Sequence, residues 1–409
     1  MTDTPALSDC CWFDHPVNTS RPWLIAGKGP SFATRTELPV GRFSVMTLND
    51  AANHIRCNVA HVIDLDAFDR LTPGTLSRVS AVVMPWRPHV DNRPDKPLAE
   101  LIGSNSPLAA VHAAGKLRWY NCGLGGRSVD PVSTRGPVVG VRYFSSEAAA
   151  NLLLARGVPR LYTIGIDGGD QYASDFDGLS PLTNGRDSFD KGVSELARIC
   201  DKHGAPLVNL ATDKVTPLTD YISAGKNRHW QDWRVIEPGP FNGRNTIRLA
   251  RLFQNVTAYE PRRVNVRTCR QLAGDIGTTN VAIMSGAFNP ATSVHAELIF
   301  HSGVLYHLAD PVEHLMQLPR VAPRLYLNTH VDRPNQPASR KTTTAGGSGW
   351  TFTEHINRPR AGLQPQSIWL EYQTLITTLV AAGYDRESIS LLSDVQESSG
   401  RRIALMASV

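Results

Sequence analysis

Long hydrophobic runs are missing from this chain of 409 residues. No stretch holds the roughly 18 consecutive apolar residues that a membrane-spanning helix needs. Residues 1–20 carry acidic side chains and no apolar centre, unlike a secretory signal. The sequence therefore predicts a protein that neither spans a membrane nor begins with such a signal.

Cysteine is scarce, with 6 residues, and only Cys10 and Cys11 are close together. Adjacent cysteines seldom form a relaxed disulfide, and no Cys/His spacing is typical of a zinc site. Because disulfides persist in oxidising compartments, we expect reduced thiols and a cytoplasmic protein without a metal site.

An excess of one charge is also lacking, since the net charge is only +5. Basic residues are scattered, and no segment interleaves them with aromatic residues as a nucleic-acid groove would. Nucleic acid is therefore not an expected partner. Hydrophobic residues make up 41% of the chain, which is enough to predict two domains with buried cores.

Short apolar runs alternate with helical segments along the first half. This alternation predicts an α/β fold with a mostly parallel sheet. We expect residues 1–20 to form an irregular arm and residues 21–218 to form the first domain. The expected strands lie within residues 22–32, 43–50, 59–68, 80–86, 160–169 and 206–211, and the expected helices are 145–157, capped by a serine, and 188–204.

The second half, residues 219–409, follows a similar plan. Residues 235–252 predict a strand, a Gly turn and an amphipathic helix, and residues 255–261 predict a strand that ends in an acid. Open α/β sheets bind ligands at the carboxyl ends of their strands. Residues 332–350 are rich in Gly, Ser, Thr and Pro and are expected to form no packed structure of their own.

Three segments of the second half resemble a class I S-adenosylmethionine (SAM) methyltransferase. They are EPGPFNG at 237–243, NVTAYEP at 255–261 and HSGVLYHLADP at 301–311, and the resemblance extends over residues 225–409. It implies a second Rossmann-like domain that ends in an antiparallel hairpin, with SAM as cofactor. The implied reaction is methyl transfer to a small molecule or glycan.

The resemblance also implies roles for individual residues. Glycines would let the backbone approach SAM beside a helix N-terminus, and an acid after the second strand would accept the ribose hydroxyls. The implied cofactor-binding residues are Glu237, Gly239, Gly243, Glu260, Ala287, Phe288 and Ser302, the catalytic residues Tyr306 and His307, and the substrate contacts Glu354 and Trp369.

Two departures leave a degenerate, non-catalytic domain open as an alternative. Pro238 and Pro240 remove N–H donors from the Gly turn. Residues 286–288 also contain no aspartate, which many relatives use to hold the adenine amine.

The first half resembles bacterial sialyltransferase-like glycosyltransferases and a related domain family that includes a pterin pyrophosphokinase. LIAGKGPSF at 24–32 and the segment 144–176 carry this resemblance. It implies a nucleotide-sugar donor, such as a cytidine monophosphate (CMP) sugar, with its phosphate cradled by backbone N–H groups and a helix N-terminus. The implied nucleotide-binding residues are Gly27, Gly29, Ser31, Asn49, Ser145, Ser146, Asp167, Gly168 and Tyr172.

The segment NGRDSFD at 184–190 lacks the histidine that sialic-acid transferases use as a base. Asp187 could serve instead, although Asp187 and Ser188 also suit plain helix caps. Transfer of pyrophosphate or a nucleotide is the alternative activity for this domain. The leading hypothesis is thus a two-domain transferase.

Overall fold

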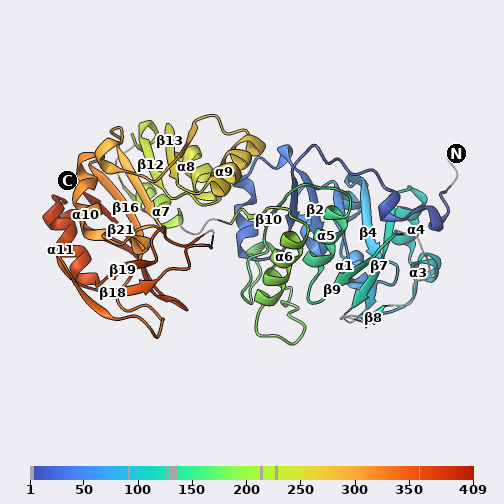
Figure 1. The fold of residues 1–409 in the computed structure, drawn as a ribbon. Coiled ribbons are helices and arrows are strands. Elements are labelled where there is room, and N and C mark those ends of the chain that lie inside the picture. Colours follow the sequence, from blue (N-terminus) through green and yellow to red (C-terminus); the bar gives the residue numbers. More distant parts are fainter. Residues whose placement is uncertain are drawn as a thin grey trace. The chain divides into compact units, whose positions relative to one another are not determined.

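The computed structural model describes residues 4–90, 93–124, 127–128, 136–211, 215–225, 229–358 and 360–409. The chain forms two compact units, unit 1 (Met1–Ala211) and unit 2 (Thr212–Val409), each built on a largely parallel sheet with helices (Figure 1). This confirms the expected fold class. The expected boundary after residue 218 falls inside helix α7 (Thr216–Ala224), which belongs to unit 2. None of the helices in the described part of the chain has the length and apolar character needed to cross a bilayer.

Unit 1 contains a nine-stranded sheet in the order β11-β10-β1-β2-β3-β4-β7-β8, with β9 also paired to β7. Only β8 runs antiparallel to its neighbour. Ligands of open α/β sheets bind where the strand order reverses, which here is between β1 and β10. The strands are β1 (Trp23–Ala26), β2 (Ser44–Leu48), β3 (Val59–His61), β4 (Ala81–Pro85), β7 (Leu117–Leu124), β8 (Arg127–Ser128), β9 (Val138–Val141), β10 (Leu161–Ile164) and β11 (Leu207–Asn209).

Helix α5 packs against β1, β2, β9 and α6. Its N-cap is Phe144 rather than the expected serine, and the side chain of Glu147 accepts the N–H groups of Arg142, Tyr143 and Phe144. A carboxylate therefore already occupies this helix end. The helices of unit 1 are α1 (Leu65–Asp69), α2 (Pro73–Arg78), α3 (Leu98–Ser104), α4 (Ser106–Ala113), α5 (Ser145–Leu154) and α6 (Asp190–Lys202).

The segment expected to be an irregular arm joins the core of unit 1. It contains two short 3-10 helices, Leu7–Asp9 and Trp12–Asp14. The side chain of Trp12 is fully buried, and its indole N–H donates to the carbonyl of Leu152 at 3.1 Å. Burial of a large aromatic residue ties this segment to α5.

Unit 2 has a seven-stranded sheet in the order β14-β13-β12-β15-β16-β21-β20. Strand β21 is antiparallel to both neighbours, which confirms the expected final hairpin. The strands are β12 (Arg234–Pro238), β13 (Asn255–Glu260), β14 (Val281–Ser285), β15 (Leu298–Ser302), β16 (Arg324–Val331), β20 (Ser390–Glu397) and β21 (Gly400–Ser408), and the helices besides α7 are α8 (Arg244–Leu252), α9 (Arg263–Ile276), α10 (Pro311–Gln317) and α11 (Tyr372–Ala382).

A separate three-stranded antiparallel sheet is formed by β17 (Lys341–Thr344), β18 (Gly347–Thr353) and β19 (Gln366–Leu370). Residues 332–350 therefore contribute to this small sheet, which packs against α11 and does not build a core by itself. β-Branched threonines favour the extended backbone. Gly347 adopts φ 141° at the turn and packs against Thr374 of α11, where a β-carbon would lie 2.6 Å from the hydroxyl oxygen.

Candidate functional site

A cavity of about 500 Å³ in unit 2 lies beyond the carboxyl ends of β12, β13 and β15. Most of the residues expected to bind SAM or its acceptor line this cavity, although they come from separate parts of the chain. The lining residues among them are Gly239, Glu260, Ala287, Phe288, Ser302, Tyr306 and His307. The sequence therefore located the cavity, although Glu237, Gly243, Glu354 and Trp369 lie outside its wall.

The turn between β12 and α8 requires both predicted glycines for conformational reasons. Gly239 has φ 61° and Gly243, the N-cap of α8, has φ 83°. L-Residues with side chains are strained in this region. A β-carbon on Gly239 would lie 2.5 Å from Cγ2 of Val304, so this position also needs the smallest residue.

The N–H groups of this turn are mostly engaged within the protein. Gly239 donates to the carbonyl of Tyr259, and Gly243 donates to that of Pro240. Because Pro238 and Pro240 carry no N–H, the expected backbone cradle is sparse. Polar side chains at the same end of the cavity supply other donors, namely Asn242, Arg244 and Asn245.

Glu260 ends β13 on the cavity wall and is only 4% exposed. Its carboxylate accepts the N–H groups of Phe241 and Arg262, at 3.1 and 2.9 Å, and the side-chain amide of Asn265 at 3.2 Å. Burial raises the pKa of Glu260 despite these hydrogen bonds. Since a carboxylate has about four acceptor positions, one remains for a ligand hydroxyl.

Glu237 does not serve as the expected contact to the methionine amine. Its side chain is 2% exposed, lies behind the turn and accepts a hydrogen bond of 2.5 Å from Thr246. Burial, helped by the charge of Glu260, raises the pKa of Glu237 to about 8. At neutral pH this group is therefore mostly uncharged and belongs to the interior.

Glu354 does not line the cavity itself, but it bonds to two residues that do, His307 and Gly362. Its Oε1 lies 2.7 Å from Nδ1 of His307 and accepts the hydroxyl of Ser367, while its Oε2 accepts the N–H of Gly362. Burial opposes ionisation, but the bonds from His307, Gly362 and Ser367 outweigh it and lower the pKa of Glu354. This arrangement is a carboxylate that orients an imidazole on the cavity wall.

Trp369 belongs to the core of the small sheet rather than to a substrate surface. It is 2% exposed, and its ring stacks on those of His330 and Phe352 at centroid distances of 4.5 and 5.1 Å. The edge of Tyr306 contacts it from the cavity side. Trp369 therefore supports Tyr306 from behind.

Residues 360–364 form a loop on the cavity wall, within the segment 351–369 that resembles a substrate-side insertion of related methyltransferases. A guanidinium N–H of Arg262 donates to the carbonyls of Ala361 and Gly362, both at 3.0 Å, and Arg360 lies over the ring of Phe241. No local pattern marks these contacts, because they join segments about 100 residues apart.

A second cavity, of about 710 Å³, lies in unit 1 at the reversal of strand order between β1 and β10. Eight of the residues expected to bind a nucleotide line it: Gly27, Gly29, Asn49, Ser145, Ser146, Asp167, Gly168 and Tyr172. Ser31 and Asp187 do not. Asp187 is exposed and α6 has Phe189 as its N-cap, while the hydroxyl of Ser188, the other expected cap, accepts the N–H of Asp190 at the start of the helix.

The expected phosphate cradle at 27–31 is occupied by contacts within the protein. Gly27 and Gly29 donate their N–H groups to the carbonyls of Ile164 and Gly165, each at 2.8 Å. Ser31 donates through its N–H and hydroxyl to Asp167, at 2.7 and 2.6 Å. The Gly-rich segment thus joins β1 to the end of β10 and presents few donors to a ligand.

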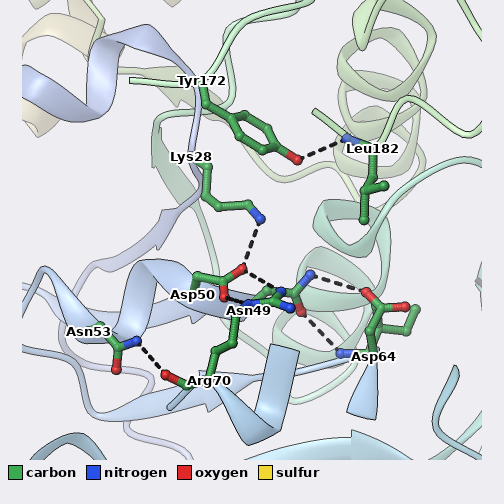
Figure 2. A network of polar contacts seen from close by, with 9 residues as sticks. Lys28, Asn49, Asp50, Asn53, Asp64, Arg70, Tyr172 and Leu182 are labelled. Carbon is green, nitrogen blue, oxygen red and sulfur yellow. Dashed lines mark hydrogen bonds and ion pairs between the residues drawn. The ribbon is translucent and has the colours of Figure 1, made fainter. Parts of the chain in front are cut away.

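A polar network beside these glycines was missed by sequence reasoning (Figure 2). Nζ of Lys28 lies 2.9 Å from Asp50, and the guanidinium of Arg70 reaches the same carboxylate at 2.5 and 3.2 Å. Nearby, the amide of Asn49 donates to Asp64 at 3.4 Å. Burial raises the pKa of Asp64 to about 6. Lys28, Asn49 and Asp64 line the cavity.

Comparisons with solved structures return methyltransferases that align with about half of the chain. The N-terminal domain of EvdMO1 with S-adenosylhomocysteine (SAH) bound is 23% identical, covering 50% of this chain and 86% of that one, with a TM-score of 0.42. The 1,6-didemethyltoxoflavin-N1-methyltransferase of Burkholderia thailandensis is 14% identical, covering 48% and 76%, with a TM-score of 0.33.

The glycopeptide N-methyltransferase MtfA is likewise 14% identical, covering 49% of this chain and 95% of that one, with a TM-score of 0.32. No protein-family model and no curated protein matches the chain.

Proposed function

We propose that unit 2 is a SAM-dependent methyltransferase that acts on a small molecule or glycan. The observation that carries the proposal is the position of Glu260, a buried carboxylate on the cavity wall that is hydrogen-bonded to the Gly turn by Phe241. The sheet supports it, because the reversed strand β21 lies between β16 and β20, the arrangement expected of a class I methyltransferase.

The residues of the cavity fit the parts of SAM. Glu260 would accept a ribose hydroxyl, the apolar Ala287 and Phe288 would border the adenine, and Asn242 and Arg244 would bind the methionine carboxylate. When bound, SAM supplies an electrophilic methyl group. The protein would hold the acceptor in line with it and exclude water from the cavity.

His307 is proposed as the general base for the acceptor. A hydroxyl acceptor must lose a proton as its oxygen attacks the methyl group, and an ammonium acceptor must lose one beforehand, so that its nitrogen has a lone pair for the attack. Glu354 holds the Nδ1–H of His307, which leaves Nε2 to receive that proton. Tyr306, whose ring centroid lies 4.3 Å from that of His307, would shape the acceptor side of the cavity.

Calorimetric titration with SAH tests the cofactor site. Wild-type protein is expected to bind SAH, and Glu260→Gln should weaken binding about tenfold or more, because hydrogen bonds to a charged group contribute about 1.5–3 kcal/mol. Glu387→Gln, at an exposed position, is the matched control. Equal SAH affinity in folded Glu260→Gln protein would remove the ribose role of Glu260.

We propose in addition that unit 1 is a nucleotide-dependent transferase, using a CMP-activated sugar or, as the alternative, transferring pyrophosphate or a nucleotide. Its cavity at the reversal of strand order supports this proposal. Thermal unfolding with CMP, or with ATP and magnesium, discriminates the two. Protection by CMP favours sugar transfer, protection by ATP favours the alternative, and protection by neither contradicts both.

A further inference from the structure

The cavity of unit 1 needs a donor for an anionic ligand, and the expected ones are engaged elsewhere. The N–H groups of Gly27, Gly29 and Ser31 donate to Ile164, Gly165 and Asp167. A ligand phosphate could not take these hydrogen bonds without separating β1 from the end of β10. Cationic side chains on the cavity wall are the remaining candidates, and these are Lys28, Arg93, Arg142 and Arg186.

The N-terminus of α5 is also a weak binding site for an anion. Glu147 is 1% exposed at this helix end and accepts three backbone N–H groups, including that of Arg142 at 2.6 Å. A carboxylate at a helix N-terminus already neutralises much of the dipole. Ser145 and Ser146 still line the cavity and can offer hydroxyl groups, but the carboxylate of Glu147 offsets part of the positive charge at this helix end.

Lys28 differs from the N–H groups of residues 27–31 and from the N-terminus of α5, because it brings a full positive charge to the cavity wall. Its side chain is 12% exposed and lies on the cavity wall, with Nζ 4.6 Å from the ring centroid of Tyr172 (Figure 2). Its partner Asp50 is 3% exposed and is shared with Arg70. Two cations on one carboxylate leave a net charge of about +1, and Lys28 is the member of this triad that lines the cavity.

Other ionisable groups lie beside this triad. Burial opposes the ionisation of Asp50, yet its bonds to Arg70 and Lys28 lower its pKa, so the triad stays ionised. Asp64 and Asp66 lie near the triad, and burial raises the pKa of Asp64 to about 6, so Asp64 is still mostly ionised at neutral pH and offsets part of the positive charge. Asp167 also lines the cavity but is bound by Ser31.

We propose that Lys28 binds the phosphate of a nucleoside monophosphate moiety in this cavity, and that Asp50 and Arg70 hold its ammonium group in place. Lys28 takes the role expected of the glycine N–H groups. The inference rests on the proposed nucleotide-dependent function of unit 1, and it names the group that recognises the ligand's charge.

Calorimetry with CMP and with cytidine tests the inference on the full chain, because the two ligands differ only by the phosphate. The Lys28→Met protein should bind CMP at least about tenfold more weakly than the wild-type protein, because it loses a charge-assisted hydrogen bond. Its affinity for cytidine should stay within about twofold of the wild-type value. Arg70→Met should weaken CMP binding by a smaller factor, since Arg70 acts through Asp50. Lys28→Arg should retain most of the CMP affinity, and Lys191→Met, exposed on α6, is the control.

The outcomes separate the two proposals. If wild-type protein binds CMP and Lys28→Met binds it equally well, Lys28 is only part of a structural ion pair and the inference fails alone. An equal loss of CMP and cytidine binding would also overturn it, because the effect would not depend on the phosphate. If wild-type protein binds neither ligand, use of a CMP donor by unit 1 fails, and the inference fails with it.

Discussion

The Nδ1 atom of His307 lies 2.7 Å from Oε1 of Glu354, and the Glu354 side chain is almost completely buried. The same carboxylate accepts the N–H of Gly362, in the loop that crosses the cavity. One buried group therefore fixes the tautomer of the proposed base and the position of that loop. Alignment of the base and closure of the cavity are linked through Glu354.

Replacing Glu354 with Gln should reduce methyl transfer by about 10²–10⁴-fold, because a neutral amide does not stabilise the imidazolium that forms when His307 accepts a proton. SAH affinity should change little, since Glu354 does not line the cavity. A screen of hydroxyl and amine acceptors with labelled SAM gives the rates. Ser367→Ala, which removes one bond to Glu354, should lose less activity. Undiminished transfer by Glu354→Gln would exclude the positioning role.

The buried carboxyl of Glu237 predicts a pH-dependent stability. Its pKa is about 8 in the folded protein, well above the ordinary value, so the folded state keeps a proton that the unfolded state releases. Stability from this group should fall as pH rises from about 4.5 to 8, by at most about 1.4 kcal/mol per pH unit. Urea unfolding at several pH values in this range should show that the free energy of unfolding depends less steeply on pH in Glu237→Gln than in the wild-type protein. Identical slopes would contradict the raised pKa.

Substituting Gly239 with Ala should destabilise unit 2 by about 1–2 kcal/mol and weaken SAH binding, because the position has φ 61° and contacts Val304. Gly274 gives a matched comparison in α9. It is exposed and has open space around it, so Gly274→Ala should stabilise the protein by up to about 1 kcal/mol. Denaturant unfolding and SAH calorimetry measure both effects. Equal behaviour of the two variants would argue against a conformational role for Gly239.

Trp12 should be essential to the core of unit 1. Trp12→Ala removes a fully buried indole and its bond to Leu152, and large-to-small changes of this kind cost about 3–5 kcal/mol. Asp14→Ala, at an exposed position in the same short helix, should change the free energy of unfolding by less than about 0.5 kcal/mol. Urea unfolding followed by circular dichroism would show the difference. A small effect at Trp12 would mean that the N-terminal segment is dispensable.

Much of the fold could be predicted because the hydrophobic pattern and the residue preferences of turns depend on short stretches of sequence. The buried strands around β1, β12 and β13 are continuous or alternating apolar runs, and glycines at positive φ mark the turn that follows β12. The β17–β18 hairpin was missed because its threonines and glycines are typical both of loops and of exposed strands. Its formation depends on packing against α11, which no local window contains.

The sites were harder to predict, because a residue type does not say where its hydrogen bonds go. Glu237 and Glu260 both end strands beside the same turn, yet one is buried behind it and the other faces the cavity. The glycines at 27 and 29 line the cavity of unit 1, but their N–H groups donate to carbonyl groups at the end of β10. Lys28 and Arg262 act through partners far away in the sequence, so no motif marks them.

The rate at which Cys269 is alkylated can report on local opening of unit 2. Cys269 is the single cysteine between residues 212 and 409, is buried against Gly243, and donates its thiol to the carbonyl of Phe241 at 3.2 Å. Burial also raises its pKa, so the folded protein shields it from alkylating reagents. The rate at which Cys269 is labelled therefore measures how often the turn between β12 and α8 opens. A molecule that binds in the adjoining cavity should lower the labelling rate of Cys269. Labelling can therefore identify ligands even when the reaction is unknown.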